Sequence, residues 1–198
     1  MSVRSDVRER VEALQTGAFL RSAEIPGSRT AVDTAMSRIA AEAGLVRVSR
    51  GLYWKGVNSR YGAGRPDPLA VALAIAGPGA GPAGFTAARA LGITTQLPAR
   101  PEVAVAGKVP EFAGAVFHKR NNLDRRGLRP VEVALLEVLR SWPTTSEVPW
   151  DELILRVGEF VDRGEIDLDH TSRVAAAERN PALRDHAAAL LDAVERGA

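Results

Sequence analysis

Two stretches of this chain concentrate side chains that bind anions, whereas groups suited to catalysis are sparse. The first stretch runs from Ser28 to Lys55 and the second from His118 to Arg129. Both combine Arg or Lys with hydrogen-bonding side chains, which suits phosphate groups and the edges of bases. What each stretch can recognise depends on the helices and strands that position these side chains.

The first stretch predicts a short helix with one apolar and one polar face. Ser28 lies where an N-cap belongs, and Gly44 is placed to end the helix. Apolar residues from Val32 to Ala43 recur at spacings of three and four, so they share one face. The other face presents short polar and basic side chains that suit base edges in a DNA major groove: Ser28, Arg29, Thr30, Asp33, Thr34, Ser37 and Arg38. The simpler interpretation is a surface helix with ordinary polar residues.

A predicted hairpin follows this helix and favours the DNA interpretation. Strand-forming residues flank a turn at Arg50-Gly51, where glycine can adopt a positive φ. Arg47, Arg50 and Lys55 project from the ribbon and can neutralise phosphates without reading sequence.

Two further pieces precede the helix and complete a small module. Residues 3–14 predict an amphipathic first helix, and residues 19–25 predict a short second helical piece that packs beneath. Helices followed by a basic hairpin form a winged helix-turn-helix, which places one helix in a major groove and a wing against the flanking backbone. We therefore expect the chain to bind double-stranded DNA.

The length of the chain leaves room for a second domain. The winged module would occupy residues 1–56, leaving residues 57–198 for a second domain. Residues 101–106 and 115–119 alternate like strands around a turn at 108–110, and most other segments have helical periodicity. The sequence therefore predicts an α+β fold, with an N-terminal winged helix-turn-helix followed by a mixed, mainly helical C-terminal domain with a small sheet.

Composition argues against an enzyme. The chain has no cysteine, which excludes disulfides, thiol catalysis and Cys-ligated zinc. Its histidines lack the spacing of metal ligands, and the glycines of residues 77–84 lack the Lys-Ser/Thr of a phosphate-binding loop. We expect no metal, no cofactor and no catalytic residue. Charged residues near the N-terminus give no sign of a signal peptide, and no apolar run could span a membrane, so we expect a cytoplasmic protein.

The distribution of charge along the chain supports the DNA-binding interpretation. Residues 1–60 hold ten Lys or Arg and six Asp or Glu, a formal charge of +4, whereas the remainder carries −2. The positive excess coincides with the predicted DNA-binding module.

The second stretch is a dense group of basic side chains. It comprises His118, Lys119, Arg120, Arg125, Arg126 and Arg129, with Asp124 the only acid among them. One interpretation is a solvated loop between a strand and a helix. The other is a second surface that contacts nucleic acid or an acidic partner.

Four motifs resemble a known family. They are Arg50-Gly51-Leu52-Tyr53, Ser59-Arg60-Tyr61-Gly62, Leu91-Gly92-Ile93-Thr94-Thr95-Gln96-Leu97-Pro98-Ala99 and His118-Lys119. Up to about Trp142 the chain resembles the shorter branch of the AbiEi-like antitoxins of type IV toxin–antitoxin systems. The resemblance implies a winged helix that binds operator DNA and represses its own operon, and a C-terminal α/β domain that contributes to antitoxicity. The functional partner would be a nucleotidyltransferase-like toxin, which such antitoxins counter without a stable complex.

We therefore expect an antitoxin that also represses its own operon. Two alternatives remain open. One is a free-standing winged-helix transcriptional regulator with a ligand-sensing C-terminal domain, and the other is a protein-interaction module. The operator, the oligomeric state and the target of the toxin do not follow from the sequence.

Overall fold

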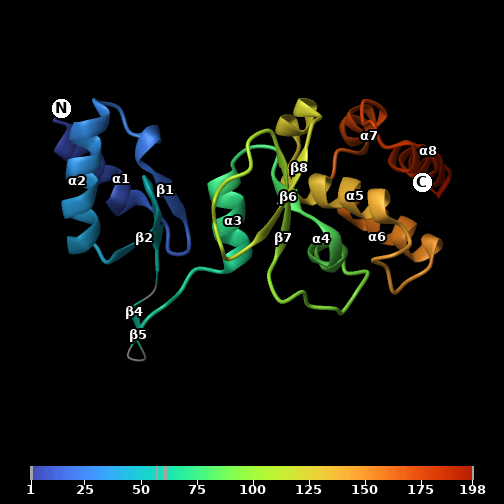
Figure 1. Cartoon of the computed structure of the whole chain (residues 1–198), viewed down its shortest axis with the longest axis horizontal. Coiled ribbons are helices and arrows are strands. Elements are labelled where there is room, and N and C mark those ends of the chain that lie inside the picture. The colour runs from blue at the N-terminus through green and yellow to red at the C-terminus, as the bar shows by residue number, and fades with distance from the viewer. Residues whose placement is uncertain (1, 57, 60–61, 198) are drawn as a thin grey trace. The chain divides into compact units, whose positions relative to one another are not determined.

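The computed structural model describes residues 2–56, 58–59 and 62–197 and has an α+β fold. The chain divides into two compact units, residues 1–75 and 76–198 (Figure 1). This division falls later in the chain than residue 56, because the segment after the predicted hairpin continues within the first unit. Arg60 and Tyr61, part of one family-like motif, lie outside the described residues.

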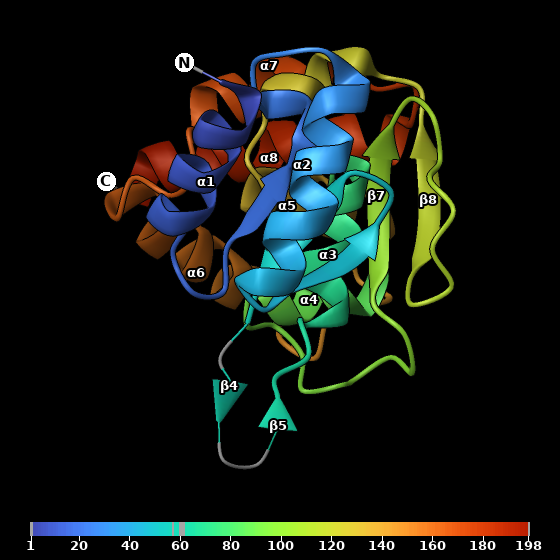
Figure 2. The same ribbon diagram turned by 90° about the vertical axis from the view of Figure 1, so that its left-hand side faces the viewer.

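The first unit contains two long helices and a three-stranded antiparallel sheet. Its elements are α1 (Val3–Ala13), β1 (Phe19–Arg21), a 3-10 helix (Ser22–Glu24), α2 (Arg29–Glu42), β2 (Leu45–Ser49), β3 (Leu52–Lys55), the short strands β4 (Asn58–Ser59) and β5 (Gly62–Ala63), and α3 (Pro68–Ala76). The strand order is β1-β3-β2. Figure 2 shows α1 beside α2, with the β4–β5 hairpin after β3.

The predicted second helical piece is a short strand followed by a single 3-10 turn. Phe19, Leu20 and Arg21 pair antiparallel with Trp54, Tyr53 and Leu52, and only the next three residues form a 3-10 turn. The sequence motif was too short to fix a helix, and pairing with β3 supplies the backbone hydrogen bonds instead. The β2–β3 hairpin, called the wing below, forms at the predicted residues.

A compact apolar core fixes α2 against the rest of the first unit. Val32, Met36, Ile39 and Ala40 bury one face of α2, as the periodicity predicts. They pack with residues from α1, β1, the end cap of the 3-10 helix and β3: Val7, Val11, Leu20, Ile25 and Tyr53. This packing holds the opposite, polar face of α2 toward solvent.

The second unit packs helices around a small mixed sheet. Its elements are β6 (Gly81–Pro82), α4 (Gly84–Ala90), β7 (Glu102–Ala106), β8 (Val116–Arg120), a 3-10 helix (Leu123–Gly127), α5 (Pro130–Ser141), α6 (Trp150–Asp162), α7 (Leu168–Ala176) and α8 (Pro181–Gly197). The central helix α5 contacts β6, α4, α7 and α8. Its residues from Glu132 to Leu139 are all buried, including the carboxylates of Glu132 and Glu137.

The strands β7 and β8 run parallel, not as the predicted turn implied. Val103 pairs with Phe117 and Val105 with Lys119, while β6 pairs antiparallel with β7 to give the order β6-β7-β8. Residues 107–115 therefore cross back to the start of β8. A local turn motif cannot specify this direction, because it depends on packing against the distant helices of the core.

The glycine-rich segment before α4 is a close-packing element. A Cβ at Gly79, whose φ is +76°, would lie 2.7 Å from the Arg126 Cα atom, and one at Gly81 would lie 2.6 Å from the Pro130 carbonyl oxygen. Glycine is thus required for this segment to approach the backbone of residues 125–130. Throughout the described part of the chain, no helix is long and apolar enough to cross a membrane.

Candidate nucleic-acid interface

Local sequence positions α2 as predicted. The Ser28 hydroxyl accepts a hydrogen bond from the Ala31 backbone N–H at 3.4 Å and caps the helix, and Gly44 ends it at a φ of +67°. Its side chains at Arg29, Thr30, Thr34 and Ser37 are exposed, and Asp33 is half-buried.

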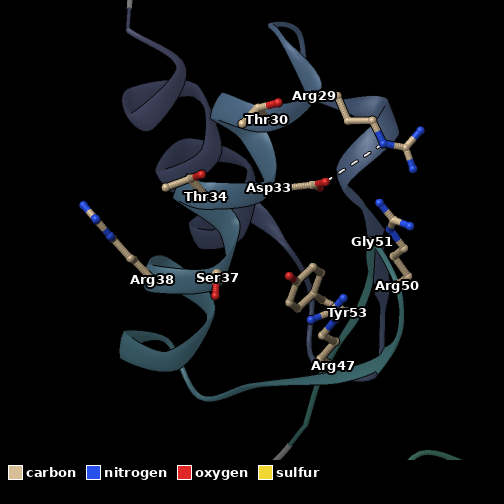
Figure 3. Close-up of a pocket in the computed structure, with 10 residues that line it drawn as sticks. All are labelled: Arg29, Thr30, Asp33, Thr34, Ser37, Arg38, Arg47, Arg50, Gly51 and Tyr53. Carbon is tan, nitrogen blue, oxygen red and sulfur yellow. Dashed lines mark ion pairs between the residues drawn. The ribbon is translucent and has the colours of Figure 1, made fainter.

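The polar face of α2 and the wing enclose a groove of about 610 Å³ (Figure 3). We call it the α2–wing groove. Its lining residues are Arg29, Thr30, Asp33, Thr34, Ser37, Arg38, Arg47, Arg50, Gly51 and Tyr53. The structure thus brings together eight of the ten residues that the sequence predicts for DNA binding.

Backbone geometry holds the wing in place beside α2. Gly51 has a φ of +70°, and its carbonyl oxygen accepts a 2.8 Å hydrogen bond from the Ser22 N–H. A Cβ at Gly51 would lie 2.7 Å from the Ser22 hydroxyl oxygen, and the positive φ would strain any other residue at this position. Arg47 donates from Nε to the Ser49 carbonyl oxygen at 3.3 Å, which steadies the start of the turn.

Positive charge predominates in the groove. Four arginines line it, and Asp33 is the one acid among the lining residues that the structure describes. The Arg29 Nε atom lies 4.0 Å from the Asp33 carboxylate, but the Arg29 side chain remains 78% exposed. A contact this long and exposed stabilises little, so the Arg29 guanidinium stays free to meet a ligand. Arg38 extends away from the wing in Figure 3.

Tyr53 lines the groove, although the sequence predicted no binding role for it and placed it only in a family-like motif. It pairs with Arg47 across β2 and β3, and its ring lies between the wing and α2 (Figure 3). The residue is 5% exposed, so it forms the floor of the groove. Alternation along β3 could have placed the Tyr53 side chain on the same face of the hairpin as Arg47, but only with the register of β2 and β3 known.

Lys55 does not contribute to the groove. Its ammonium group donates to the carbonyl oxygens of Val11 at 3.1 Å and Leu14 at 2.7 Å, at the C-terminal end of α1. Carbonyl groups at the end of a helix lack partners in the helix and favour a cation. Lys55 therefore stabilises the module instead of facing phosphates, and Ser28 acts as the cap of α2.

The second basic stretch does not form an exposed basic surface. Arg125 is fully buried and donates to Glu137 Oε1 at 2.7 Å and to Glu178 Oε1 at 2.6 Å. Arg120 forms a bidentate pair with Glu137, and Arg140 donates to Glu178 Oε2 at 2.6 Å. We call these five residues the C-terminal ion cluster.

The remaining members of the stretch differ in exposure. His118 Nε2 lies 2.8 Å from the Glu102 carboxylate, and Arg129 pairs with Glu132 at 2.7 Å and with the Gly164 carbonyl oxygen at 2.6 Å. Lys119 and Arg126 are exposed. Only these two of the six predicted residues therefore remain exposed and without an acidic partner among the residues that the structure describes.

Burial and pairing set the protonation of the cluster. Burial opposes the charge of Glu137, but its hydrogen bond to Arg120 and the charge of Arg125 outweigh burial and lower its pKa. Burial lowers the pKa of Arg140, and repulsion from Arg120 and Arg125 adds to the effect.

The similarity of this chain to known proteins is distant. The chain matches no protein family and no curated protein. It is similar to the RV2827C protein from Mycobacterium tuberculosis over 98% of this chain and 79% of that chain, with 18% identity and a TM-score of 0.41. A likeness this distant says nothing about function. Among the described residues, no group of His, Asp and Glu is arranged to hold a metal ion.

Proposed function

We propose that this chain is a cytoplasmic DNA-binding protein that represses its own operon and acts as the antitoxin of a type IV toxin–antitoxin system. Double-stranded operator DNA would be its direct ligand. A nucleotidyltransferase-like toxin would be its functional partner, without need for a stable complex.

The α2–wing groove carries the DNA part of this proposal. It combines exposed hydroxyl and guanidinium groups on one helix with two arginines on an adjacent hairpin. Groups of the first kind, at Arg29, Thr30 and Thr34, suit the donors and acceptors of a major groove. Arginines of the second kind, Arg47 and Arg50, suit the phosphates that flank it. A helix in the major groove with a wing on the backbone uses both kinds at once.

The antitoxin part has a different basis. It rests on the sequence resemblance, chiefly on the block from Leu91 to Ala99. In the structure this block leaves α4, buries Ile93 and then runs along the surface, where the Thr95 N–H donates to the Glu147 carboxylate at 2.8 Å. Through these contacts the block packs within the second unit, and we propose that it also contributes to the antitoxin function.

Two experiments test the two parts separately. For DNA binding, footprinting on the DNA upstream of the gene should show protection at a defined site. Equal affinity for that DNA and for a scrambled duplex of the same length would refute sequence-specific repression.

For the antitoxin role, co-expression with the product of an adjacent nucleotidyltransferase-like gene should restore growth. Growth arrest that persists despite intact operator binding would favour the free-standing regulator. Failure to bind the upstream DNA at all would favour a protein-interaction module.

A further inference from the structure

A second polar pocket lies wholly within the C-terminal unit. It has a volume of about 380 Å³ and is formed by the end of β8, the 3-10 helix after it, α5 and the loop between α7 and α8. We call it the C-terminal pocket. Its lining residues are Lys119, Arg120, Asn121, Asn122, Leu123, Asp124, Arg140, Ala177, Glu178, Arg179 and Asn180.

We propose that this pocket binds a small molecule that carries a phosphate group. This proposal goes beyond the proposed function and does not depend on it. Four cationic side chains, Lys119, Arg120, Arg140 and Arg179, converge there with three side-chain amides. Guanidinium forks and amide N–H groups are the donors that match phosphate oxygens.

The wall of the pocket is short of negative charge. In the C-terminal ion cluster, three guanidinium groups share the carboxylates of Glu137 and Glu178, which leaves one formal positive charge. Arg140, which lines the pocket, has one buried nitrogen without a hydrogen-bond partner among the described residues, Nε, which lies 3.7 Å from Glu137 Oε1. An uncompensated charge is costly away from water, and an anion bound beside Arg120 and Arg140, the two cluster arginines that line the pocket, would offset that cost.

Two cations on the rim of the pocket add to its positive charge. Lys119 and Arg179 are exposed, and neither has an acidic partner within the part of the chain that the structure describes. The pocket also lies at the start of α8, whose N-cap is Asn180, with its side-chain oxygen accepting from the Leu183 N–H at 2.9 Å. The positive end of this helix dipole adds to the same attraction.

The shape and charge of the pocket favour a small ligand over a nucleic acid. Asp124 and Glu178 line it between the cations, so the surface around it is mixed in sign and would repel part of a continuous phosphate backbone. Few apolar side chains line it, which argues against a hydrophobic effector. Its volume is within the range of small-molecule sites.

Thermal unfolding of the full chain tests the proposal with inorganic phosphate as the probe. Potassium phosphate at about 100 times its dissociation constant should raise the midpoint by about 5–10 °C above potassium chloride of equal ionic strength. The variant Lys119→Gln/Arg179→Gln removes both rim cations and leaves the buried cluster intact, so its phosphate affinity should fall at least tenfold. Arg173→Gln, at an exposed position of α7 outside the pocket, is the control and should retain the shift.

Calorimetric titration then distinguishes the source of the phosphate. Tighter binding of AMP than of inorganic phosphate would indicate a nucleotide, and equal binding would indicate that the phosphate alone is recognised. Two results would overturn the proposal. One is a phosphate shift of wild type no larger than that of chloride; if the double variant then also binds duplex DNA more weakly, the pocket is a DNA contact instead. The other is a phosphate shift that the double variant retains in full.

Discussion

The arginines of the α2–wing groove and those of residues 118–129 look alike in sequence but lie in opposite surroundings. In the groove, the Arg29 side chain is 78% exposed and Arg47 and Arg50 extend into solvent. In the second stretch, Arg125 is fully buried between two carboxylates. The first group is free to meet a ligand, and the second mainly holds the C-terminal fold together.

The difference lies in where the acids are. Within the first unit, the polar face of α2 offers only Asp33 to the groove. In the second unit, Glu137 comes from α5 and Glu178 from the loop between α7 and α8, and folding brings both to Arg125. A run of cations therefore predicts an exposed basic surface only when no distant acid reaches it.

The largest expected effect concerns the buried cluster. Glu137→Gln leaves Arg120 and Arg125 without their shared carboxylate, so we expect a loss of about 3–5 kcal/mol in the free energy of unfolding. Urea denaturation measures it, and Glu111→Gln, at an exposed position of the same unit, is the control. A loss below about 1 kcal/mol for Glu137→Gln would contradict the structural role of the cluster.

The cluster should also make stability depend on pH. Because pairing lowers the pKa of Glu137 below its unfolded value, its stabilisation is complete above that unfolded value and is lost as pH falls through the folded pKa. Denaturation between pH 6 and pH 3 should thus show a steeper loss for wild type than for Glu137→Gln. Parallel pH profiles would show that the carboxylate is not stabilised by its arginines.

In the α2–wing groove, side chains of α2 should discriminate between base pairs. Thr34→Val and Arg29→Gln each remove donors without adding bulk, and each should cost about 1–3 kcal/mol on the operator and little on a scrambled duplex. Equilibrium binding to both duplexes measures this, with Arg10→Gln on α1 as the control. Equal losses on both duplexes would mean that α2 contacts only phosphates.

Lys55 is a cation of the first unit that bonds to the protein itself, unlike the exposed arginines of the groove. Lys55→Met keeps the apolar stem but removes the donor at the end of α1, so we expect a loss of about 1–2 kcal/mol in stability. The salt dependence of DNA binding should stay the same. A flatter salt dependence with unchanged stability would instead assign Lys55 to the DNA backbone.

The sequence predicted the parts of the fold that local pattern determines. Ser28 and Gly44 set the limits of α2, apolar spacing set its buried face, and Gly51 set the turn of the wing. The α+β fold class followed from the same patterns. The direction of β8 relative to β7 did not, because it depends on contacts between distant segments.

Whether each cation is exposed or paired also depends on contacts between distant segments. Lys55 reaches α1 only because β3 pairs with β1, and Arg125 meets Glu178 across 53 positions of the chain. One signal was nonetheless present in the sequence. Glu132 and Glu137 interrupt an otherwise apolar run in α5, and buried carboxylates of this kind require cationic partners.

The salt dependence of DNA binding by two matched double variants tests the central claim most directly. Arg47→Gln/Arg50→Gln removes two exposed cations from the wing, and Lys119→Gln/Arg126→Gln removes two from residues 118–129. Binding of the full chain to its upstream duplex is measured against chloride concentration, in a buffer without phosphate. We predict that the wing variant flattens the slope of log K against log salt by about 1.8, while the other variant leaves it unchanged. An unchanged slope for the wing variant, or an equal change in both, would contradict the assignment of DNA binding to the α2–wing groove.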